Sequence, residues 1–488
     1  MADAQGSLMQ LKNYINNDWQ APAITLDTQV CHASEGRPLF YQMASDAAQI
    51  ENAIATAHIA HAVGEWAALS SAERAVAMDA IADAIGKRLE AIAKADAICT
   101  GVLLKTTSQV AQICVLAFRA AANLLRNPPV RQPFAGPHGD VIVERLPLGP
   151  AAIIAPWNAP SGITCHKLAS ALAAGCPVIV KPSEWAPQSG QLIAEAVVEA
   201  GLPAGVFQLA HGNGATGAAL VADSRIAAVS FTGGLQAGRA VAAACARDIK
   251  PAQLELGGNN PIVVLEDADI DAAAEGIING ITTLNGQWCR ALGRLLVHES
   301  VAESLLSAVT ARLEEIRLGH ALDEASTMGP VVHKGHFELV QQAIAHYEAL
   351  GGHCLRPTAL PELEGYFIAP TLITGLAAEQ ASEEIFGPVA TVHTFSDDAE
   401  AIDQANGTPF GLAAYVFGEE QHAWKVARGI RAGNIKINAV SMLNLNPMAP
   451  RPAWGLSGLG DEGVVETFEF FRGTRIIGVA GTMEPVHG

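Results

Sequence analysis

The 488-residue sequence predicts an α/β fold in which two parallel-sheet domains flank a cleft. The chain is too long for one ordinary hydrophobic core. From about Val141, short β-rich runs alternate with Ala-rich helical runs, and the same alternation resumes after Gly286. Strands that alternate with helices are typical of parallel sheets covered by helices on both faces.

The composition indicates a folded globular protein rather than a disordered, nucleic-acid-binding or membrane-binding one. Hydrophobic residues make up 50% and charged residues 16% of the chain. The net charge of 30 − 49 = −19, without a long basic run, makes nucleic acid and anionic membranes poor partners. No apolar run approaches the ~18 residues of a membrane span, and the N-terminus lacks a signal-peptide pattern, so we expect a cytoplasmic protein. The eight cysteines form no CxxC pair, which predicts neither disulfides nor a structural metal.

The elements are expected in the following order. Helices fill residues 46–105, where Ser70 and Glu73 form a capping box. Further helices are expected over 164–174, 187–200 and 214–222. The strands are expected at VIVERL, AAIIAP, PVIVKP, VFQLAH, AAVSFTG and PIVVLE, and in the second half at LGRLLV, ATVHTF, AAYVF and NIKIN. The segments 129–146 and 474–480 lie outside both patterns, and we expect them to form a protruding arm.

Three loops at the ends of predicted strands favour a dinucleotide site. Gly212–Gly217 has the pattern G-x-G-x-x-G between a strand and a helix, although a simple tight turn fits it equally well. A second glycine turn, 231–234, leads to Gly238, and a third loop runs from Lys181 to Glu184. Ligands bind at the carboxyl ends of parallel strands, so three such loops together indicate a dinucleotide.

Three residues are candidates for catalysis, each with an ordinary alternative. Glu255, between apolar residues and a glycine pair, is either a buried general base or an ion-pair partner. Cys289 lies on a glycine-containing loop beside Arg290, which favours a thiolate, but any of the eight cysteines could be a core residue. Asn158, between two prolines, is either a fixed amide donor or part of a turn.

These segments together resemble the aldehyde dehydrogenase superfamily over about residues 12–480. The resemblance is carried, in order, by PWNAP, KPSE, LELGGNNP, NGQWCRALGR, EIFGP, PFGL and GNIKIN. It implies that Cys289 is the nucleophile, Glu255 the general base and Asn158 the oxyanion donor, with Lys167 as a further catalytic residue. The implied cofactor-binding residues are Trp157, Lys181, Ser183, Glu184, Gly214, Phe231, Gly233, Gly234, Gly238, Leu256, Glu384 and Phe386.

The resemblance also implies an architecture and a cofactor. Residues 1–126 and 148–257 are expected to form a variant Rossmann domain for NAD(P), with the phosphates near the Gly233 turn. Residues 258–455 are expected to form the catalytic domain, and 127–147 with 472–488 an arm that pairs between subunits of a homodimer or homotetramer. NAD is favoured because Glu184 would repel a 2′-phosphate, although Lys181 and Ser183 leave NADP possible.

The implied reaction is oxidation of an aldehyde to a carboxylic acid, through a Cys289 thioester that Glu255 helps to hydrolyse. The alternatives are a CoA-acylating dehydrogenase, against which Glu255 argues, and a catalytically silent binding protein. The aldehyde itself stays open: small Ala159 and Gly162 beside Trp288 favour an apolar or aromatic substrate, whereas Arg290 favours one that carries a carboxylate. Gly234, where the family often has a hydroxyl residue, and the loop 441–455 depart from the family pattern.

Two further patterns are not expected to bind metal. Asp267, Asp269 and Asp271 are reminiscent of a calcium loop, but Ala272 replaces its required glycine, so Asp269 is more simply a helix N-cap. His58 and His61 lie one turn apart without a further ligand nearby in the sequence.

Overall fold

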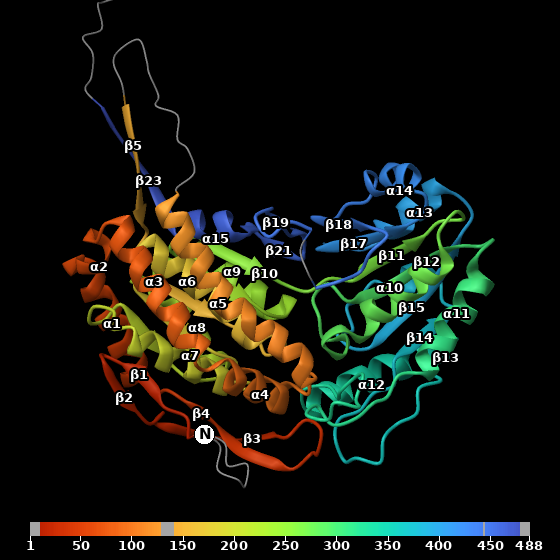
Figure 1. Ribbon diagram of the computed structural model, residues 1–488, viewed down its shortest axis with the longest axis horizontal. Coiled ribbons are helices and arrows are strands. Elements are labelled where there is room, and N and C mark those ends of the chain that lie inside the picture. The colour runs from red at the N-terminus through yellow and green to blue at the C-terminus, as the bar shows by residue number, and fades with distance from the viewer. Residues whose placement is uncertain (1–9, 128–140, 443–444, 479–488) are drawn as a thin grey trace, which may run out of the picture.

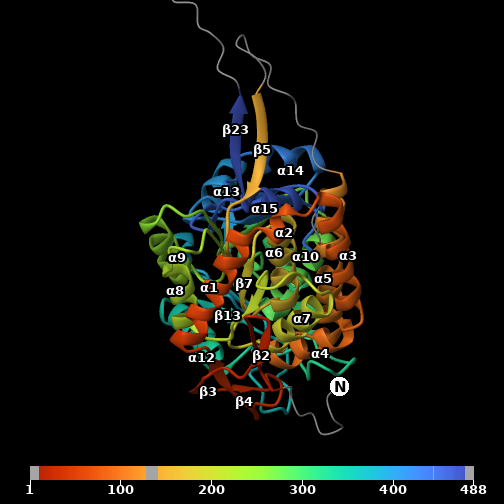
Figure 2. The ribbon, with the colours of Figure 1, turned by 90° about the vertical axis from the view of Figure 1, so that its left-hand side faces the viewer.

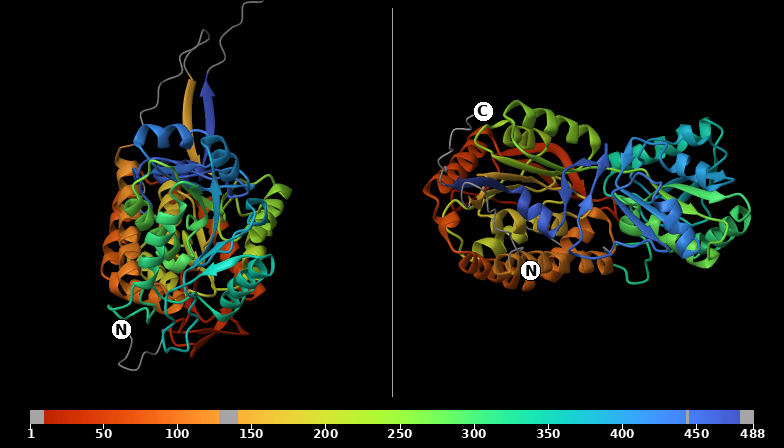
Figure 3. Two further views of the ribbon diagram at one scale, coloured as in Figure 1. Left: turned by 90° about the vertical axis from the view of Figure 1, so that its right-hand side faces the viewer. Right: turned by 90° about the horizontal axis from the view of Figure 1, so that it is seen from above.

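The computed structural model describes residues 10–127, 141–442 and 445–478. Two α/β units lie side by side, each built on its own sheet, and a two-stranded arm projects from the first unit (Figure 1; Figure 3 shows the two units from above). The α/β fold class is therefore confirmed.

The first sheet is parallel at its centre and antiparallel at its edges. Its order is β2-β1-β8-β7-β6-β9-β10-β21, and the strands from β8 to β10 run parallel. The strands are β1 (Asn13–Ile15), β2 (Asp18–Gln20), β6 (Ala151–Ile154), β7 (Val178–Lys181), β8 (Phe207–Leu209), β9 (Ala228–Thr232), β10 (Ala252–Glu255) and β21 (Gly458–Leu459). The central strands are almost wholly buried, as expected for a sheet covered on both faces.

Helices cover both faces of this sheet (Figure 2). They are α1 (Ala47–Val63), α2 (Glu65–Ala68), α3 (Ser71–Gly86), α4 (Leu89–Thr100), α5 (Leu104–Arg126), α6 (Pro160–Ala174), α7 (Gln188–Glu199), α8 (Gly214–Ala222), α9 (Leu235–Arg247) and α15 (Val464–Phe470). One core holds residues of α3 to α7 and α15, and a second holds residues of α1, α8 and α9. The predicted capping box is confirmed, because Glu73 N–H donates to Ser70 Oγ (3.2 Å) and Ser70 N–H donates to Glu73 Oε2 (2.8 Å).

In the described part of the chain, α5 alone is long and apolar enough to meet the criteria for a membrane span, with a mean hydropathy of 1.3. It packs against α3, α4 and α6, and its side chains Cys114 and Phe118 are completely buried between them. This packing is that of a core helix.

The second unit repeats the same design. Its sheet has the order β13-β14-β15-β12-β11-β17-β18, and only β13 is antiparallel. Its strands are β11 (Asn260–Val264), β12 (Leu292–His298), β13 (His353–Leu355), β14 (Thr371–Thr374), β15 (Val389–Phe395), β17 (Ala413–Phe417) and β18 (Asn434–Ile437). Its helices are α10 (Ile270–Thr282), α11 (Ala302–Glu314), α12 (Lys334–Ala349), α13 (Asp398–Ala405) and α14 (Glu420–Ala427), with short 3-10 turns η1 (Thr283–Gly286) and η2 (Ala378–Gln380). Asp269 caps α10, as predicted, by accepting from Ala272 N–H (3.0 Å).

The arm consists of β5 (Val141–Pro147) and β23 (Arg472–Gly478), which pair antiparallel within one chain (Figure 2). Pairing between subunits would therefore use the outer edges of β5 and β23. Residues 129–140 and 479–480 of the predicted arm segments lie outside the described residues. The other short strands are β3 (Ile24–Cys31), β4 (Pro38–Ala44), β16 (Phe410–Gly411), β19 (Arg451–Pro452), β20 (Trp454–Gly455) and β22 (Asp461–Glu462). Because β21 pairs with β10, the chain after residue 455 returns to the first sheet, and the predicted domain division stays a prediction.

Ile249, in the turn after α9, is strained. Its φ is +55° and its side chain is 87% exposed, so it occupies the left-handed region without packing in return. We expect Ile249→Gly to raise the free energy of unfolding, because glycine removes a strain of about 1 kcal/mol at this φ. The net gain is smaller than this strain, because glycine also makes the unfolded chain more flexible and so stabilises the unfolded state. Thermal and urea unfolding measure this change. Ile59→Gly, at an exposed position inside α1, is the control and should lower stability by about 0.5–1 kcal/mol; a lower stability of Ile249→Gly would contradict the prediction.

Candidate active site

A cleft of about 680 Å³ runs along the carboxyl ends of β6, β7, β9 and β10 and ends at Cys289. It is lined by every predicted site residue except Lys167 and Gly238. Ligands of open parallel sheets bind at this edge. The structure therefore gathers residues as far apart as Trp157 and Phe386 around one cavity.

Cys289 is presented by a loop with an unusual backbone. Leu284, Asn285 and Gly286 all have positive φ, of 49°, 58° and 75°. The Asn285 amide fixes this loop by donating to the carbonyls of Gly101 (2.9 Å) and Pro330 (2.8 Å). A side chain at residue 286 would collide with the Pro388 backbone, at 2.3 Å, so only glycine fits there. Strain that the surroundings enforce is common where a reactive group must be held in place.

The surroundings of the half-buried Cys289 thiol favour its protonated form. Burial raises its pKa to about 12, the carboxylates of Glu255, Glu384 and Glu462 add to this rise, and Arg290 opposes it. Arg290 therefore acts in the expected direction, because it lowers the pKa of the thiol, but burial and the three carboxylates raise this pKa by more than one cation lowers it. The nucleophile needs a base to remove its proton.

Glu255 is suited to accept that proton. It ends β10, is 7% exposed, and its Oε1 has no hydrogen-bond partner among the described residues. Burial raises the pKa of its carboxyl to about 8, and Glu462 raises it further, against the cations Lys167, Arg290 and Arg451. An unpaired buried carboxyl with a pKa near neutrality is typical of a general base rather than of a structural ion pair.

Asn158 lies just before α6 and is 8% exposed. Its amide nitrogen donates to the carbonyl of Gln287, two residues before Cys289, at 2.9 Å. This bond fixes the amide against the nucleophile loop. The second N–H of the amide is not used by this bond, and it lies in the same cleft as Cys289.

Lys167 lies behind the cleft rather than in it. Its Nζ is buried, 2.7 Å from Glu462 Oε1 and 2.8 Å from Gln253 Oε1. Glu462 also pairs with Arg451 (3.3 Å), and its pKa lies well below the usual range because the cations around it outweigh its burial. Sequence reasoning missed Glu462. Its only signal is a Gly-rich stretch, 458–463, that includes the acidic pair Asp461-Glu462.

The far end of the cleft has the features of a dinucleotide site. Lys181 Nζ lies 3.0 Å from Glu184 Oε2, so a cation and a carboxylate sit together at the end of β7. The side chain of Asn213 caps α8 through Ala215 N–H (3.0 Å), whereas α9 begins after Gly234 without a side-chain cap. The N–H groups at the start of α9 are therefore the better phosphate donors.

Gly238 serves the packing of α9 instead of lining the cleft. A Cβ at residue 238 would lie 2.4 Å from the Leu256 side chain, so the glycine lets this helix approach the strand end that carries Glu255. Leu256 itself lines the cleft.

The loop 384–386 closes the cleft near Cys289. Glu384 Oε1 accepts from Gly258 N–H at 2.8 Å, and burial raises the pKa of its carboxyl to about 7. Phe386 has φ +55°, its ring meets the Trp157 ring edge-on (centroids 5.4 Å apart), and its carbonyl lies 2.8 Å from His336 Nε2. Sequence reasoning missed His336, because nothing in the sequence sets it apart from the other fourteen histidines.

A separate cluster joins His32, Glu35 and His320, whose ligand atoms lie within 4.8 Å of one another. Both ring Nδ1 atoms accept backbone N–H groups, from Ser34 (3.3 Å) and Leu322 (3.1 Å). The ring protons must then sit on Nε2 and point toward Glu35, whereas a metal on Nε2 would need them on Nδ1. This geometry favours a hydrogen-bonded cluster, and the expected absence of a metal stays a prediction.

Comparisons with known proteins agree with this geometry. Residues 19–477 match the Aldehyde dehydrogenase family. The chain is 37% identical over 449 residues to a betaine aldehyde dehydrogenase of Cereibacter sphaeroides, covering 90% of each chain. It is 36% identical over 351 residues to a succinate-semialdehyde dehydrogenase of Paenarthrobacter nicotinovorans, covering 70% of this chain and 77% of that protein. The crystal structure of betaine aldehyde dehydrogenase from Staphylococcus aureus in complex with NAD⁺ superposes with a TM-score of 0.93 at 29% identity, over 98% of this chain and 97% of that chain.

Proposed function

The chain belongs to the aldehyde dehydrogenase family, and on that premise we propose that it oxidises an aldehyde to a carboxylic acid with NAD. The observation that carries the proposal is a single cleft lined by Cys289, Glu255 and Asn158 at one end and by Lys181 and Glu184 at the other. The formation of NADH from NAD and a panel of aldehydes, without CoA, tests it. If NADH forms only when CoA is added, the protein is an acylating dehydrogenase instead. If NADH does not form with any aldehyde, it is a catalytically silent relative.

The proposed roles follow from the geometry. Glu255 removes the Cys289 proton, and the sulfur adds to the aldehyde carbon. The Asn158 amide stabilises the negative charge that develops on the aldehyde oxygen. NAD, when bound, supplies the acceptor for the hydride, and the acyl group stays on Cys289 as a thioester. Glu255 first releases the thiol proton to solvent and then takes a proton from water, whose oxygen attacks the thioester; the C–S bond breaks, the acid leaves, and Cys289 takes up a proton again. Lys167 and Glu462 lie behind Glu255 and do not touch the substrate in this scheme. They act on the pKa of the Glu255 carboxyl, which Lys167 lowers and Glu462 raises.

The proposed cofactor is NAD, with NADP a poorer substitute. Glu184 places a carboxylate beside Lys181, where the ribose hydroxyls are proposed to bind, and a 2′-phosphate there meets like charge. We expect kcat/KM to favour NAD by about tenfold or more, since such a contact costs on the order of 1–2 kcal/mol. Glu184→Gln should lower the ratio of kcat/KM for NAD to kcat/KM for NADP. Glu90→Gln, at an exposed position on α4, is the control and should leave this ratio unchanged. A clear preference for NADP in the unmodified protein would contradict this.

The reacting end of the cleft holds charges of both signs. Three cations, Lys167, Arg290 and Arg451, act on Glu255 together with one ionised carboxylate, Glu462. Around Cys289 the balance is reversed, because the carboxyl groups of Glu255, Glu384 and Glu462 face Arg290 alone, so the charges of the site do not rank a cationic aldehyde below an uncharged or anionic one.

The residues beside Cys289 are proposed to decide instead. We expect hexanal or benzaldehyde to have the highest kcat/KM if small Ala159 and Gly162 beside Trp288 shape the pocket, and succinic semialdehyde if Arg290 anchors a carboxylate. Arg290→Met should lower kcat/KM for the semialdehyde more than for hexanal if a carboxylate is recognised, and equally if the pocket selects apolar chains. A kcat/KM for betaine aldehyde above those of the other three aldehydes would contradict both alternatives.

The proposed assembly is a homodimer or homotetramer in which β5 and β23 offer unpaired outer edges to another subunit. The proposed location is the cytoplasm. The proposed assembly and location do not affect the roles proposed for Cys289, Glu255 and Asn158.

A further inference from the structure

The groove between α8 and α9 is the least polar part of the cleft. It is lined by Gly217, Ala218 and Val221 of α8 and by Ala237, Ala240 and Ala244 of α9. These residues recur at three- or four-residue spacing, so one face of each helix forms one wall. Two walls of small apolar side chains suit a flat aromatic ring held by contact area alone, as the adenine of NAD would be.

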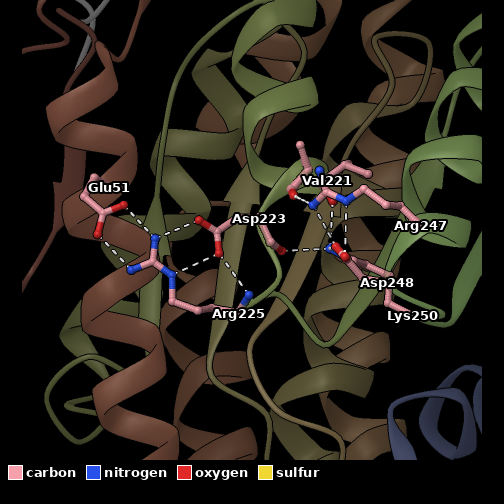
Figure 4. Close-up of polar contacts among 8 residues, drawn as sticks. Glu51, Val221, Asp223, Arg225, Arg247, Asp248 and Lys250 are labelled. Atoms are coloured by element: carbon pink, nitrogen blue, oxygen red, sulfur yellow. Dashed lines mark hydrogen bonds and ion pairs between the residues drawn. The ribbon is translucent and has the colours of Figure 1, made fainter.

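Two cations hold the end of this groove (Figure 4). Lys250 Nζ donates to the carbonyls of Val221 (2.8 Å) and Asp223 (2.7 Å) and lies 3.4 Å from Asp248 Oδ2. Arg247, in the last turn of α9, donates to the carbonyl of Ala222. These carbonyls end α8 and have no partner within the helix. Because Val221 and Ala222 also line the groove, the bonds tie one wall directly to the end of the other.

The turn that carries Lys250 is strained. Ile249, just before it, is exposed and has φ +55°, and Lys250 N–H closes the turn on the Cys245 carbonyl (3.1 Å). An isoleucine gains nothing from this conformation, so the conformation persists because the surrounding contacts enforce it. Its effect is to place the Lys250 side chain, which is 3% exposed, under the last turn of α8.

A second tie holds the same end of α8 from the opposite side. Arg225 pairs with Asp223 (2.7 Å) and with Glu51 of α1 (2.6 Å), as Figure 4 shows. The end of α8 therefore stands between α1, to which the partly exposed Arg225 ties it, and the turn after α9, and it cannot move away from α9 without breaking the bonds of the buried Lys250 ammonium.

We propose that Lys250, assisted by Arg247, is a positioning residue that sets the width of the α8–α9 groove and thereby the affinity for the adenosine half of NAD. The inference rests on the proposed use of NAD. Lys250 touches neither the cofactor nor the aldehyde in this scheme, and it acts only through the carbonyls that it binds. Its loss leaves Cys289 and Glu255 unchanged, so binding weakens while chemistry at saturation is kept.

Calorimetric titration of the full-length protein with NAD and with AMP tests the proposal without turnover. In Lys250→Met the dissociation constants of both ligands should rise by the same factor, roughly tenfold, because AMP carries the part of NAD that the groove holds. The kcat at saturating NAD and the KM for aldehyde should change by less than about twofold. Lys87→Met removes an exposed ion pair to Glu199, far from the groove, and should leave both dissociation constants unchanged.

A merely structural lysine gives a different result. Lys250→Met with a lower unfolding temperature but unchanged AMP binding would overturn the proposal. If Lys250→Met fails to fold, Arg247→Met tests the proposal, because the Arg247 side chain is 61% exposed and its removal frees the Ala222 carbonyl at the cost of only one further, exposed pair with Asp248. A rise of about threefold in the AMP dissociation constant supports the proposal, and no rise overturns it. An unmodified protein that binds neither ligand would overturn the cofactor assignment itself.

Discussion

Replacing Cys289 with alanine is expected to abolish NADH formation, a loss of more than about 10³-fold in kcat, for every aldehyde. The other seven cysteines cannot replace Cys289 as the nucleophile, because none of them lines the cleft. Without the sulfur no covalent adduct forms, and the aldehyde hydrogen is not activated as hydride. NAD binding should be retained, since the residues proposed to hold it are untouched; calorimetry measures it on the same sample.

Alkylation of the unmodified protein adds a pH test of the same residue. Because burial holds the pKa of the Cys289 thiol near 12, its reaction with iodoacetamide should keep rising with pH through pH 9, without a plateau near neutrality. Mass spectrometry identifies the labelled cysteine. Cys354→Ala, at a half-buried thiol outside the cleft, is the matched control and should retain full activity. NADH formation by Cys289→Ala, or a plateau in labelling below pH 7, would contradict the assignment.

The sequence predicted the parts of the fold that local patterns encode. The central strands β6, β7, β9 and β11 are short apolar runs bounded by Gly, Pro or Asn, and helices begin where a capping residue such as Ser70 or Asp269 marks them. The edges were not predicted, because β1 pairs with β8 and β21 with β10 across about 200 residues of sequence, and no local pattern specifies such a register.

The same distinction applies to the site. Cys289, Glu255 and Asn158 each lie in a recognisable motif, and they do line one cleft. The electrostatics depend on long-range packing: Lys167 acquires its partner Glu462 only when the chain after residue 455 returns to the first sheet. The raised pKa of the Cys289 thiol likewise follows from the packing and the carboxylates around it, which the adjacent Arg290 in the sequence does not reveal.

Glu255→Gln should separate hydride transfer from hydrolysis. Glutamine keeps the size of the side chain and can hydrogen bond, but it cannot take a proton from water, so the thioester on Cys289 accumulates. Stopped-flow absorbance should show one equivalent of NADH per site followed by a steady state lower by roughly 10²–10⁴-fold, the usual loss for a general base. Since Glu255 also faces a protonated thiol, the burst itself should be slower than in the unmodified protein.

The pH dependence distinguishes this role from a structural one. Burial raises the pKa of the Glu255 carboxyl to about 8, so the fraction present as carboxylate, and with it turnover, should rise between pH 6 and pH 9. In Glu255→Gln this rise should disappear from the steady state, and mass spectrometry should find the acyl adduct on Cys289. Glu266→Gln, at a carboxylate outside the cleft, should keep the normal pH profile. Near-normal steady-state turnover by Glu255→Gln would show that another group activates the water; Glu384, which lines the same cleft and has a carboxyl pKa that burial raises to about 7, would be the candidate.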